Sequence, residues 1–163
     1  MSGRRVMNWL GALMLVGVLA VTVYSASPAP SVAADQPSIE AMVSRVWDGS
    51  TLDAYVDGRR TAVGYLGVET PAANTPCGRD ALERNRQLAG GRVLLEADPA
   101  YELDEIGRRL YYAYTPDGVS IDAALISEGL ARAARTDASH GADLLAIQAE
   151  AQAAGRGCVW AAS

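Results

Sequence analysis

The chain contains no lysine, a single histidine and only two cysteines among its 163 residues. All fourteen basic residues are therefore arginines, and nineteen acidic residues outnumber them. Proteins that bind nucleic acid usually carry a basic face, so this balance argues against a nucleic-acid partner, although it leaves room for a local basic groove. One histidine without any Cys-x-x-Cys spacing argues against a zinc site. The sequence contains no internal repeat.

Hydrophobic residues are concentrated near the N-terminus, where residues 6–24 are apolar apart from Asn8 and Thr22. At about 1.5 Å per residue this stretch is roughly 28 Å long as a helix, close to the thickness of a bilayer core. Arg4 and Arg5 precede it, and the next basic residue is Arg45. This asymmetry predicts a cytoplasmic N-terminus, with the remainder of the chain on the extracytoplasmic side.

Residues 1–24 fit either a membrane anchor or a cleaved signal peptide. A signal peptidase site is available in "SVAA" before Asp35, but it lies ten residues beyond Tyr24. Because that distance is long for a cleavage site, we expect the segment to stay attached as an anchor; cleavage would leave a secreted protein. Residues 25–36 are small, polar and proline-containing, which indicates a flexible linker before a globular domain at 37–163. The exported part has twelve arginines against nineteen acids, a formal charge of −7.

The two cysteines are Cys77 and Cys158. Two cysteines in one small exported domain most often form a disulfide, whereas two buried free thiols are the alternative. We expect the disulfide, which would close a loop of about 80 residues and stabilise the fold by roughly 4–5 kcal/mol.

The sequence predicts strands at 39–47, 51–56, 61–68, 92–98 and 109–118, the last ending in a turn. Apolar and polar side chains alternate in 51–56 and 92–98, and 39–47 mixes β-branched and apolar residues. The segment 61–68 is apolar on both faces, so it should be a central strand. Helices are predicted at 78–90, 122–131 and 141–154, the first and last ending at glycines. Asp122 stands where it could cap the second helix.

Several motifs follow one another in this order: "DGST", "YLGVETP", "GRDA", "DEIGRRLYYAY", "IDAALISEGLA" and "AEAQAAGRGCVW". In order and spacing they resemble the staphylococcal nuclease (thermonuclease) family, over nearly all of residues 39–160. The resemblance implies an α+β, mainly β fold: a five-stranded OB-type barrel with three helices, here preceded by one N-terminal transmembrane or signal helix.

The same resemblance implies a calcium site, because a hard cation prefers oxygen ligands. Asp48, Glu69 and Thr70 match positions of that site and are its weak candidates. Ser50 stands where the family's "D-G-D-T" turn has a second aspartate, so one negative charge is missing. The Asp48–Gly49 pair also fits an ordinary β-turn.

The family's catalytic groups are two arginines and a glutamate, which stabilise a crowded phosphate and orient the attacking water. Gly64 replaces the first arginine, and Ala72 replaces the glutamate. Arg108 matches the second arginine and is the only catalytic remnant. It fits a phosphate-binding role or a structural ion pair with Asp104 or Glu69.

Other residues have simpler interpretations. Arg135 and Asp137 stand where the family often has tyrosines that stack on nucleotides. His140 precedes the last helix, and we expect it to be exposed to solvent. Three strand tyrosines could stack on bases, but at alternating positions they favour packing in and around the barrel: Tyr111, Tyr112 and Tyr114.

The sequence therefore predicts an exported, membrane-anchored, thermonuclease-like domain that has lost catalysis and serves as a binding or structural module without a cofactor. An unidentified protein partner is expected, for example a membrane complex of which the chain is an accessory subunit; nucleic acid is not expected. The alternative is a weak calcium-dependent phosphodiesterase of the thermonuclease type, acting on DNA or RNA through Asp48, Glu69, Thr70 and Arg108.

Overall fold

A computed structural model describes residues 37–161 of the chain. The apolar segment and the linker predicted from the sequence lie outside these residues. Within 37–161, none of the helices is both long and apolar enough to cross a bilayer.

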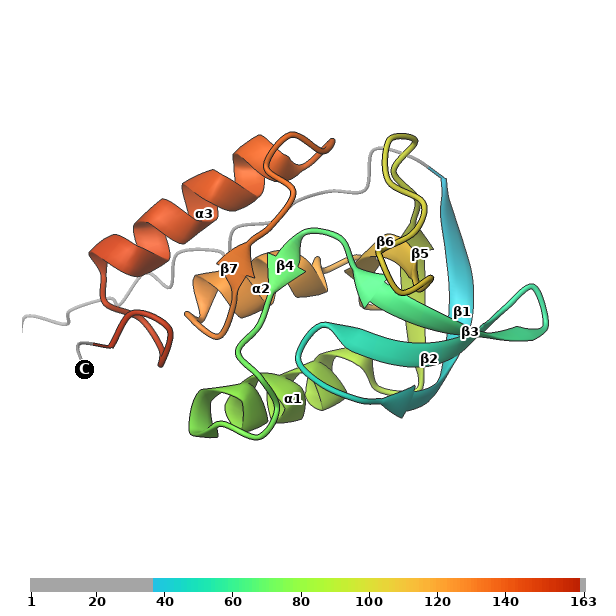
Figure 1. Cartoon of the computed structure of the whole chain (residues 1–163), viewed down its shortest axis with the longest axis horizontal. Helices are drawn as coiled ribbons and strands as arrows, with labels where there is room; N and C mark the ends of the chain where they lie inside the picture. The colour runs from blue at the N-terminus through green and yellow to red at the C-terminus, as the bar shows by residue number, and fades with distance from the viewer. Residues whose placement is uncertain (1–36, 162–163) are drawn as a thin grey trace, which may run out of the picture.

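Five strands form a closed barrel: β1 (Ser38–Val46), β2 (Thr51–Val56), β3 (Arg59–Tyr65), β5 (Arg92–Glu96) and β6 (Arg109–Tyr114). Their order around the barrel is β1-β2-β3-β6-β5, and Figure 1 shows them gathered at one end of the molecule. All neighbours are antiparallel except β3 and β6, which run parallel. The five-stranded barrel expected from the sequence is thereby confirmed.

The barrel closes through β1, which pairs with two neighbours along its length. Residues Ser38–Met42 pair with β5, and Met42–Val46 pair with β2. An irregularity in register between Val43 and Arg45 lies within the second half. A bulge of this kind bends a strand and increases its twist, so a single nine-residue strand can serve both sides of the closure.

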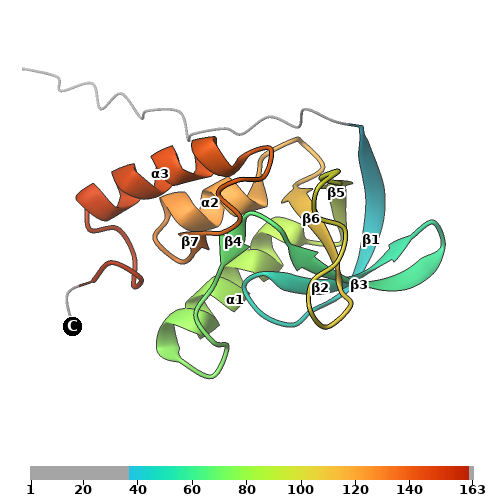
Figure 2. The same cartoon turned by 45° about the horizontal axis from the view of Figure 1, so that its top comes forward.

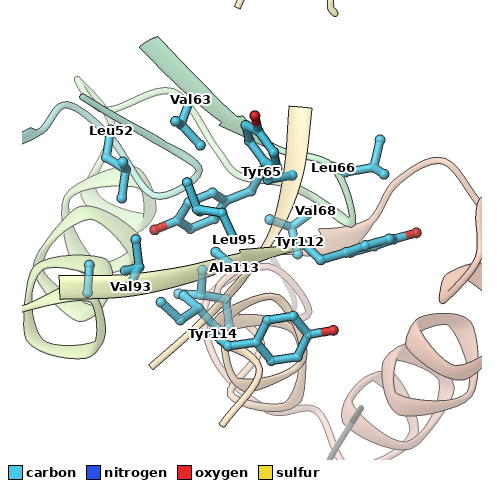
Figure 3. Close-up of a cluster of buried hydrophobic side chains, with 14 of the residues drawn as sticks. Leu52, Val63, Tyr65, Leu66, Val68, Val93, Leu95, Tyr112, Ala113 and Tyr114 are labelled. Atoms are coloured by element: carbon cyan, nitrogen blue, oxygen red, sulfur yellow. The ribbon is translucent and has the colours of Figure 1, made fainter. Parts of the chain in front are cut away.

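Side chains from alternate strand positions fill the barrel, as the alternating pattern predicted (Figure 3). Leu52, Val63 and Leu95 are fully buried there. The tyrosines at 111, 112 and 114 are also buried, so the interpretation that they pack rather than stack on bases is confirmed. In Figure 3 the hydroxyls of Tyr112 and Tyr114 point the same way, away from the barrel strands.

Three helices accompany the barrel: α1 (Pro76–Ala89), α2 (Ile121–Ser127) and α3 (Gly141–Ala153). Thr75 caps α1 by accepting a hydrogen bond from the Gly78 amide. Pro76 lies in the first turn, where a backbone N–H would have no partner within the helix, so its absence costs nothing. α2 is shorter than predicted and is followed by Gly129 in the left-handed region. Figures 1 and 2 show α3 lying along α2, with α1 on the other side.

The predicted strand 61–68 is not continuous: it divides into β3 and the short β4 (Val68–Glu69). At Gly67 the backbone amide donates to the Asp122 carboxylate at 3.0 Å, and the carbonyl accepts from Ala134. A Cβ at Gly67 would lie 2.5 Å from a methyl carbon of Leu144, so the close approach requires glycine. β4 consequently leaves the barrel and pairs with β7 (Arg132–Ala133), a strand that the sequence analysis missed.

The expectation that Asp122 caps α2 is also wrong. Ser120 is the cap, since its hydroxyl accepts a hydrogen bond from the Ala123 amide. Asp122 is completely buried instead, and its two oxygens accept from the amides of Gly67 and Ala113. The carboxylate thus joins α2 to two segments of the barrel.

His140 was expected at the surface, but only 2% of it is exposed. Its Nε2 lies 3.1 Å from both carboxylate oxygens of the buried Glu96, and its ring packs edge-on against Tyr112. The Tyr114 hydroxyl donates to the same carboxylate at 2.6 Å. Residues around the start of α3 are therefore fixed to β5 and β6 by buried polar groups, each of which has a hydrogen-bonding partner.

The expected disulfide between Cys77 and Cys158 is present, with Cα atoms 5.6 Å apart. It connects the first turn of α1 to the segment after α3, across 81 residues. The tail is also held by the Val159 amide, which donates to the carbonyl of Gly129.

Candidate functional site

An open cleft of about 440 Å³ lies between the start of β2, the end of β3, β4 and the start of β6. Five residues singled out in the sequence line it: Ser50, Gly64, Glu69, Thr70 and Arg108. Asp48 and Ala72 are not among the lining residues. The fold therefore brings together most of the predicted site, although those residues come from segments up to 58 positions apart.

The turn between β1 and β2 approaches the cleft through Asp48 and Ser50. Asp48 Oδ1 accepts hydrogen bonds from the Ser50 amide at 2.8 Å and from the Ser50 hydroxyl at 3.4 Å. The Ser50 hydroxyl also lies 3.3 Å from Thr70 Oγ1. From below, the buried Asn85 donates to the Asp48 carbonyl and accepts from the Tyr65 hydroxyl, which fixes the turn to α1 and β3.

These groups do not fit a calcium site. Calcium takes about six to eight oxygen ligands, usually including several carboxylates. Within the part of the chain that the structure describes, the carboxylates in or beside the cleft are Asp48, whose Oδ1 already accepts from Ser50, the exposed Glu69, and Asp104, which is paired with Arg108. The hydroxyls of Ser50 and Thr70 are bonded to each other. Among residues 37–161, no group of three or more His, Cys, Asp or Glu side chains is placed to hold a metal ion.

Arg108 enters the cleft from the start of the β6 segment and is held on two sides. Its Nε donates to Asp104 Oδ2 at 2.5 Å, and its Nη1 donates to Thr51 Oγ1 at 2.8 Å. Asp104 also accepts from the Arg108 and Ile106 amides. Burial opposes ionisation of Asp104, but the hydrogen bonds from Arg108 outweigh it and lower the pKa of the carboxyl. The ion pair foreseen with Asp104 is present, and a third of the Arg108 side chain remains exposed.

Two of the expected catalytic side chains are absent at their positions. Gly64 lies beneath Arg108: a Cβ there would be 3.8 Å from Arg108 Nε and 3.1 Å from a methyl carbon of Leu110. Ala72 is exposed, and its carbonyl accepts from the Thr75 amide and hydroxyl just before α1. Position 64 therefore faces the cleft without any side chain, and position 72 carries only a methyl group.

The cleft contains a second arginine that the sequence analysis did not place there. Arg135 follows β7, lines the cleft together with Arg108, and has a backbone φ of +48°. Its guanidinium lies 5.2 Å from the centre of the Tyr101 ring, and the Tyr101 hydroxyl donates to Asp137. One signal was available in the sequence: Arg135 and Asp137 align with tyrosines that stack on nucleotides in the family. That Arg135 lines the same cleft as Arg108 depends on the fold.

Comparisons with known proteins agree with the architecture. The staphylococcal nuclease homologue family matches residues 62–162. The chain is 38% identical over 103 residues to Endonuclease YncB of Bacillus subtilis strain 168, a match covering 59% of this chain and 48% of that protein. It is 37% identical over 103 residues to the SPbeta prophage-derived endonuclease YokF of the same strain, covering 59% and 34%. The thermonuclease of Staphylococcus intermedius is 37% identical over 99 residues, covering 56% and 58%. Each match spans less than two thirds of the relative.

Proposed function

Because the chain belongs to the staphylococcal nuclease homologue family, we propose that it is an exported nuclease-fold domain that binds a partner without hydrolysing phosphodiesters. The observation that carries this proposal is the exposed methyl group of Ala72, at the position where the family has its water-orienting glutamate. A methyl group can neither accept a proton nor orient water.

The expected loss of rate is large. Removing a general base commonly costs about 10²–10⁴-fold, and removing one electrostatic donor costs about 10²–10³-fold. The chain lacks the base at Ala72 and the donor at Gly64, and the two losses need not multiply. Among acids that line the cleft, Asp104 is held by Arg108, which leaves Glu69 as the acid available to act in place of the missing base.

That remaining carboxylate supports an alternative: a weak calcium-dependent phosphodiesterase. Glu69, Thr70 and Arg108 line one cleft, and the named relatives are endonucleases. An active enzyme would use Arg108 to stabilise the phosphate and Glu69 and Asp48 as oxygen donors. This function is the second candidate because the oxygen donors at the cleft do not fit a calcium site.

We also propose that the domain works on the extracytoplasmic side of the cytoplasmic membrane, anchored through residues 6–24, and docks on a protein partner there. The apolar segment, its flanking arginines and the formal charge of −7 on the exported part support this placement. A pull-down from detergent-solubilised membranes should recover the chain with its apolar segment and a reproducible partner. Recovery of a chain that begins at Asp35 would refute the anchor.

The catalytic part is tested with the full chain in mild detergent, incubated with single-stranded DNA, duplex DNA or RNA and calcium. We expect no cleavage at protein concentrations where the Staphylococcus intermedius thermonuclease, run in parallel as a positive control, gives measurable cleavage. Robust calcium-dependent cleavage that disappears in Arg108→Ala would instead establish the phosphodiesterase.

A gain-of-function variant tests the same reasoning from the opposite direction. Ser50→Asp, Gly64→Arg and Ala72→Glu together restore the family pattern, and a Cβ at position 64 requires a small movement of Leu110, whose methyl carbon would lie 3.1 Å away. The carboxylate introduced by Ser50→Asp would lie beside that of Asp48, so these two carboxylates should repel each other until calcium binds. We expect calcium to raise the melting temperature of this variant and to support measurable cleavage.

The matched control carries Ser50→Asn, Gly64→Arg and Ala72→Gln, which preserve side-chain size without the two new carboxylate charges. It should show neither effect. Equal behaviour of the two triple variants would mean that the missing carboxylates do not explain the loss of activity.

A further inference from the structure

We propose that one end of the barrel binds the C-terminal carboxylate of a partner polypeptide that ends in an apolar residue. The site is a cavity of about 370 Å³, where β1, β3 and β6 begin and β2 ends. It is separate from the cleft that contains Arg108, and the two have different lining residues. The inference rests on the proposed function, because it names the chemistry of the partner on which the domain docks.

Two arginines line this cavity at strand positions whose face, further along, is the interior of the barrel. Side chains on one face of a strand recur every two residues. Arg59 lies four positions before the fully buried Val63 on β3, and Arg109 lies two positions before the buried Tyr111 on β6. The inner face of both strands therefore changes from apolar to basic at the end of the barrel where the cavity lies.

The guanidinium groups of these two arginines are not engaged within the described part of the chain. Residues 37–161 contain twelve arginines. Five form ion pairs, three lie over aromatic rings and two donate to backbone carbonyls. Arg59 and Arg109 are the remaining two, and both are exposed. Their charges are therefore available to a ligand.

Tyr111 provides a third polar group at the cavity. Its side chain is 5% exposed, and its hydroxyl has no hydrogen-bonding partner among residues 37–161. The hydroxyls of the other buried tyrosines, Tyr65, Tyr112 and Tyr114, are all hydrogen-bonded. Tyr111 and Arg109 both line this cavity and a neighbouring one of about 200 Å³. Because buried polar groups normally have partners, the free hydroxyl near Arg109 indicates a place for a ligand.

These groups favour a monocarboxylate over a phosphate dianion. Asp57 also lines the cavity, so the two arginines and this acid give it a formal charge of +1, which one negative charge balances. Each free guanidinium offers two adjacent nitrogens to a planar carboxylate, the arrangement in which this pair is strongest. Ile39 and Val56, which pack with the core, also line the cavity, so the group attached to the carboxylate should be apolar.

An unpaired strand edge beside the cavity favours a polypeptide as the carrier of this carboxylate. β3 pairs with β2 from Arg59 to Gly64, but its pairing with β6 begins only at Val63. The first four residues of β3 therefore have a strand on one side only, and Figures 1 and 2 show the β2–β3 hairpin projecting beyond the barrel. An extended peptide can add to such an edge through main-chain hydrogen bonds. The cavity volume lies within the range of small-ligand pockets, roughly 300–1,000 Å³, and can receive its terminal residue.

The test measures binding to the full chain in mild detergent by isothermal titration calorimetry. The main probe is the N-acetylated peptide Gly-Ser-Val-Val with a free carboxylate. Four further probes are the same peptide as a C-terminal amide, acetylated Gly-Ser-Gly-Gly with a free carboxylate, isovalerate and methyl phosphate. The variants are Arg59→Gln, Arg109→Gln and Tyr111→Phe. Arg86→Gln removes the same charge from an exposed arginine on α1 and is the matched control.

We expect the main probe to bind and its amide to bind at least about tenfold more weakly, because charge-assisted hydrogen bonds to the carboxylate are lost. The glycine-ending peptide lacks apolar side chains, and isovalerate lacks a backbone, so each should also bind about tenfold more weakly. Arg59→Gln and Arg109→Gln should each weaken binding by at least about tenfold, and Tyr111→Phe by about threefold. Arg86→Gln should leave it unchanged.

Four results would overturn the proposal. The main probe could fail to bind, its amide could bind equally well, methyl phosphate could bind as tightly, or both Arg59→Gln and Arg109→Gln could leave binding unchanged. Isovalerate that binds as tightly as the peptide would refute a polypeptide as the ligand. Melting temperatures of all variants are measured in parallel, and those of the exposed arginine variants should stay within a few degrees of the unmodified protein.

The pull-down from detergent-solubilised membranes, repeated with the Arg59→Gln, Arg109→Gln double variant, separates this proposal from the proposed function. Loss of both the partner and the peptide supports the site as the docking surface. A double variant that still recovers the partner would refute the site and leave the proposed function intact. Peptide binding by the unmodified chain, without any partner recovered from membranes, would refute the docking function and leave the carboxylate site intact.

Discussion

Removing the disulfide should lower the stability of the domain by several kcal/mol. Replacing Cys77 and Cys158 with alanine opens a loop that spans 81 residues, and the chain-entropy relation gives about 4.5 kcal/mol for a loop of that length at 25 °C. This is the upper end, because the tail keeps other contacts. The Val159 amide still donates to Gly129, and the Arg156 amide still donates to Ala151.

Local effects should accompany the global one. The disulfide, together with Glu69, Thr70, Pro71 and Arg132, lines a second cavity of about 360 Å³ next to the cleft. Without the bond, the first turn of α1 and the tail lose their covalent link across this cavity. We therefore expect the tail to exchange its amide hydrogens faster, with little change in the barrel strands.

The assay is urea unfolding of the full chain in mild detergent, followed by circular dichroism, for the oxidised protein, the reduced protein and the double alanine variant. We expect the free energy of unfolding to fall by about 2–4.5 kcal/mol in the variant, and by a similar amount on reduction. A loss below about 1 kcal/mol with an unchanged m-value would refute the reasoning, because loop closure would then contribute little. Two alkylatable thiols in the unreduced protein would contradict the disulfide itself.

Two buried groups give further predictions. His140→Leu removes the partner 3.1 Å from the Glu96 carboxylate, so we expect unfolding by urea at a lower concentration, with a loss of about 1–3 kcal/mol; His140→Gln, which retains an N–H, should lose less. Burial raises the pKa of Asp122 from its ordinary 3.8 to about 6, so the folded state favours the protonated form. Its stabilising contribution is complete below about pH 4 and is lost as the pH rises through about 6. The unfolding free energy of the unmodified protein, relative to Asp122→Asn, should therefore fall by about 2.4 kcal/mol between pH 4 and pH 7. A difference that is constant with pH would refute this assignment.

Local patterns in the sequence determined most of the secondary structure. The alternation in 51–56 gave β2 with its observed bounds, because side chains on one face of a strand recur every two residues. Glycines placed the ends of α1 and α3 within a residue or two, since few other residues end a helix so readily. The pairing of Cys77 with Cys158 followed from their number and from the predicted export, without any geometry.

The replacements at Ser50, Gly64 and Ala72 were also legible in the sequence, because they fall within ordered motifs. These motifs carry no information on side chains that reach the cleft from other parts of the chain. Arg135 lines the same cleft as Arg108 because β4 leaves the barrel to pair with β7, and at that point the Gly67 amide is bonded to Asp122. No residue within 61–68 signals the break by itself.

Burial of single polar residues was decided entirely by the tertiary structure. His140 has no periodic neighbours that mark it as internal, and a loop position before a helix is usually exposed. It is buried because the residue before α3 lies against β5 and β6, where Glu96, Tyr112 and Tyr114 provide the polar and aromatic contacts that a buried imidazole requires. Those three partners are 26 to 44 positions away in the chain, so only the folded arrangement brings them together.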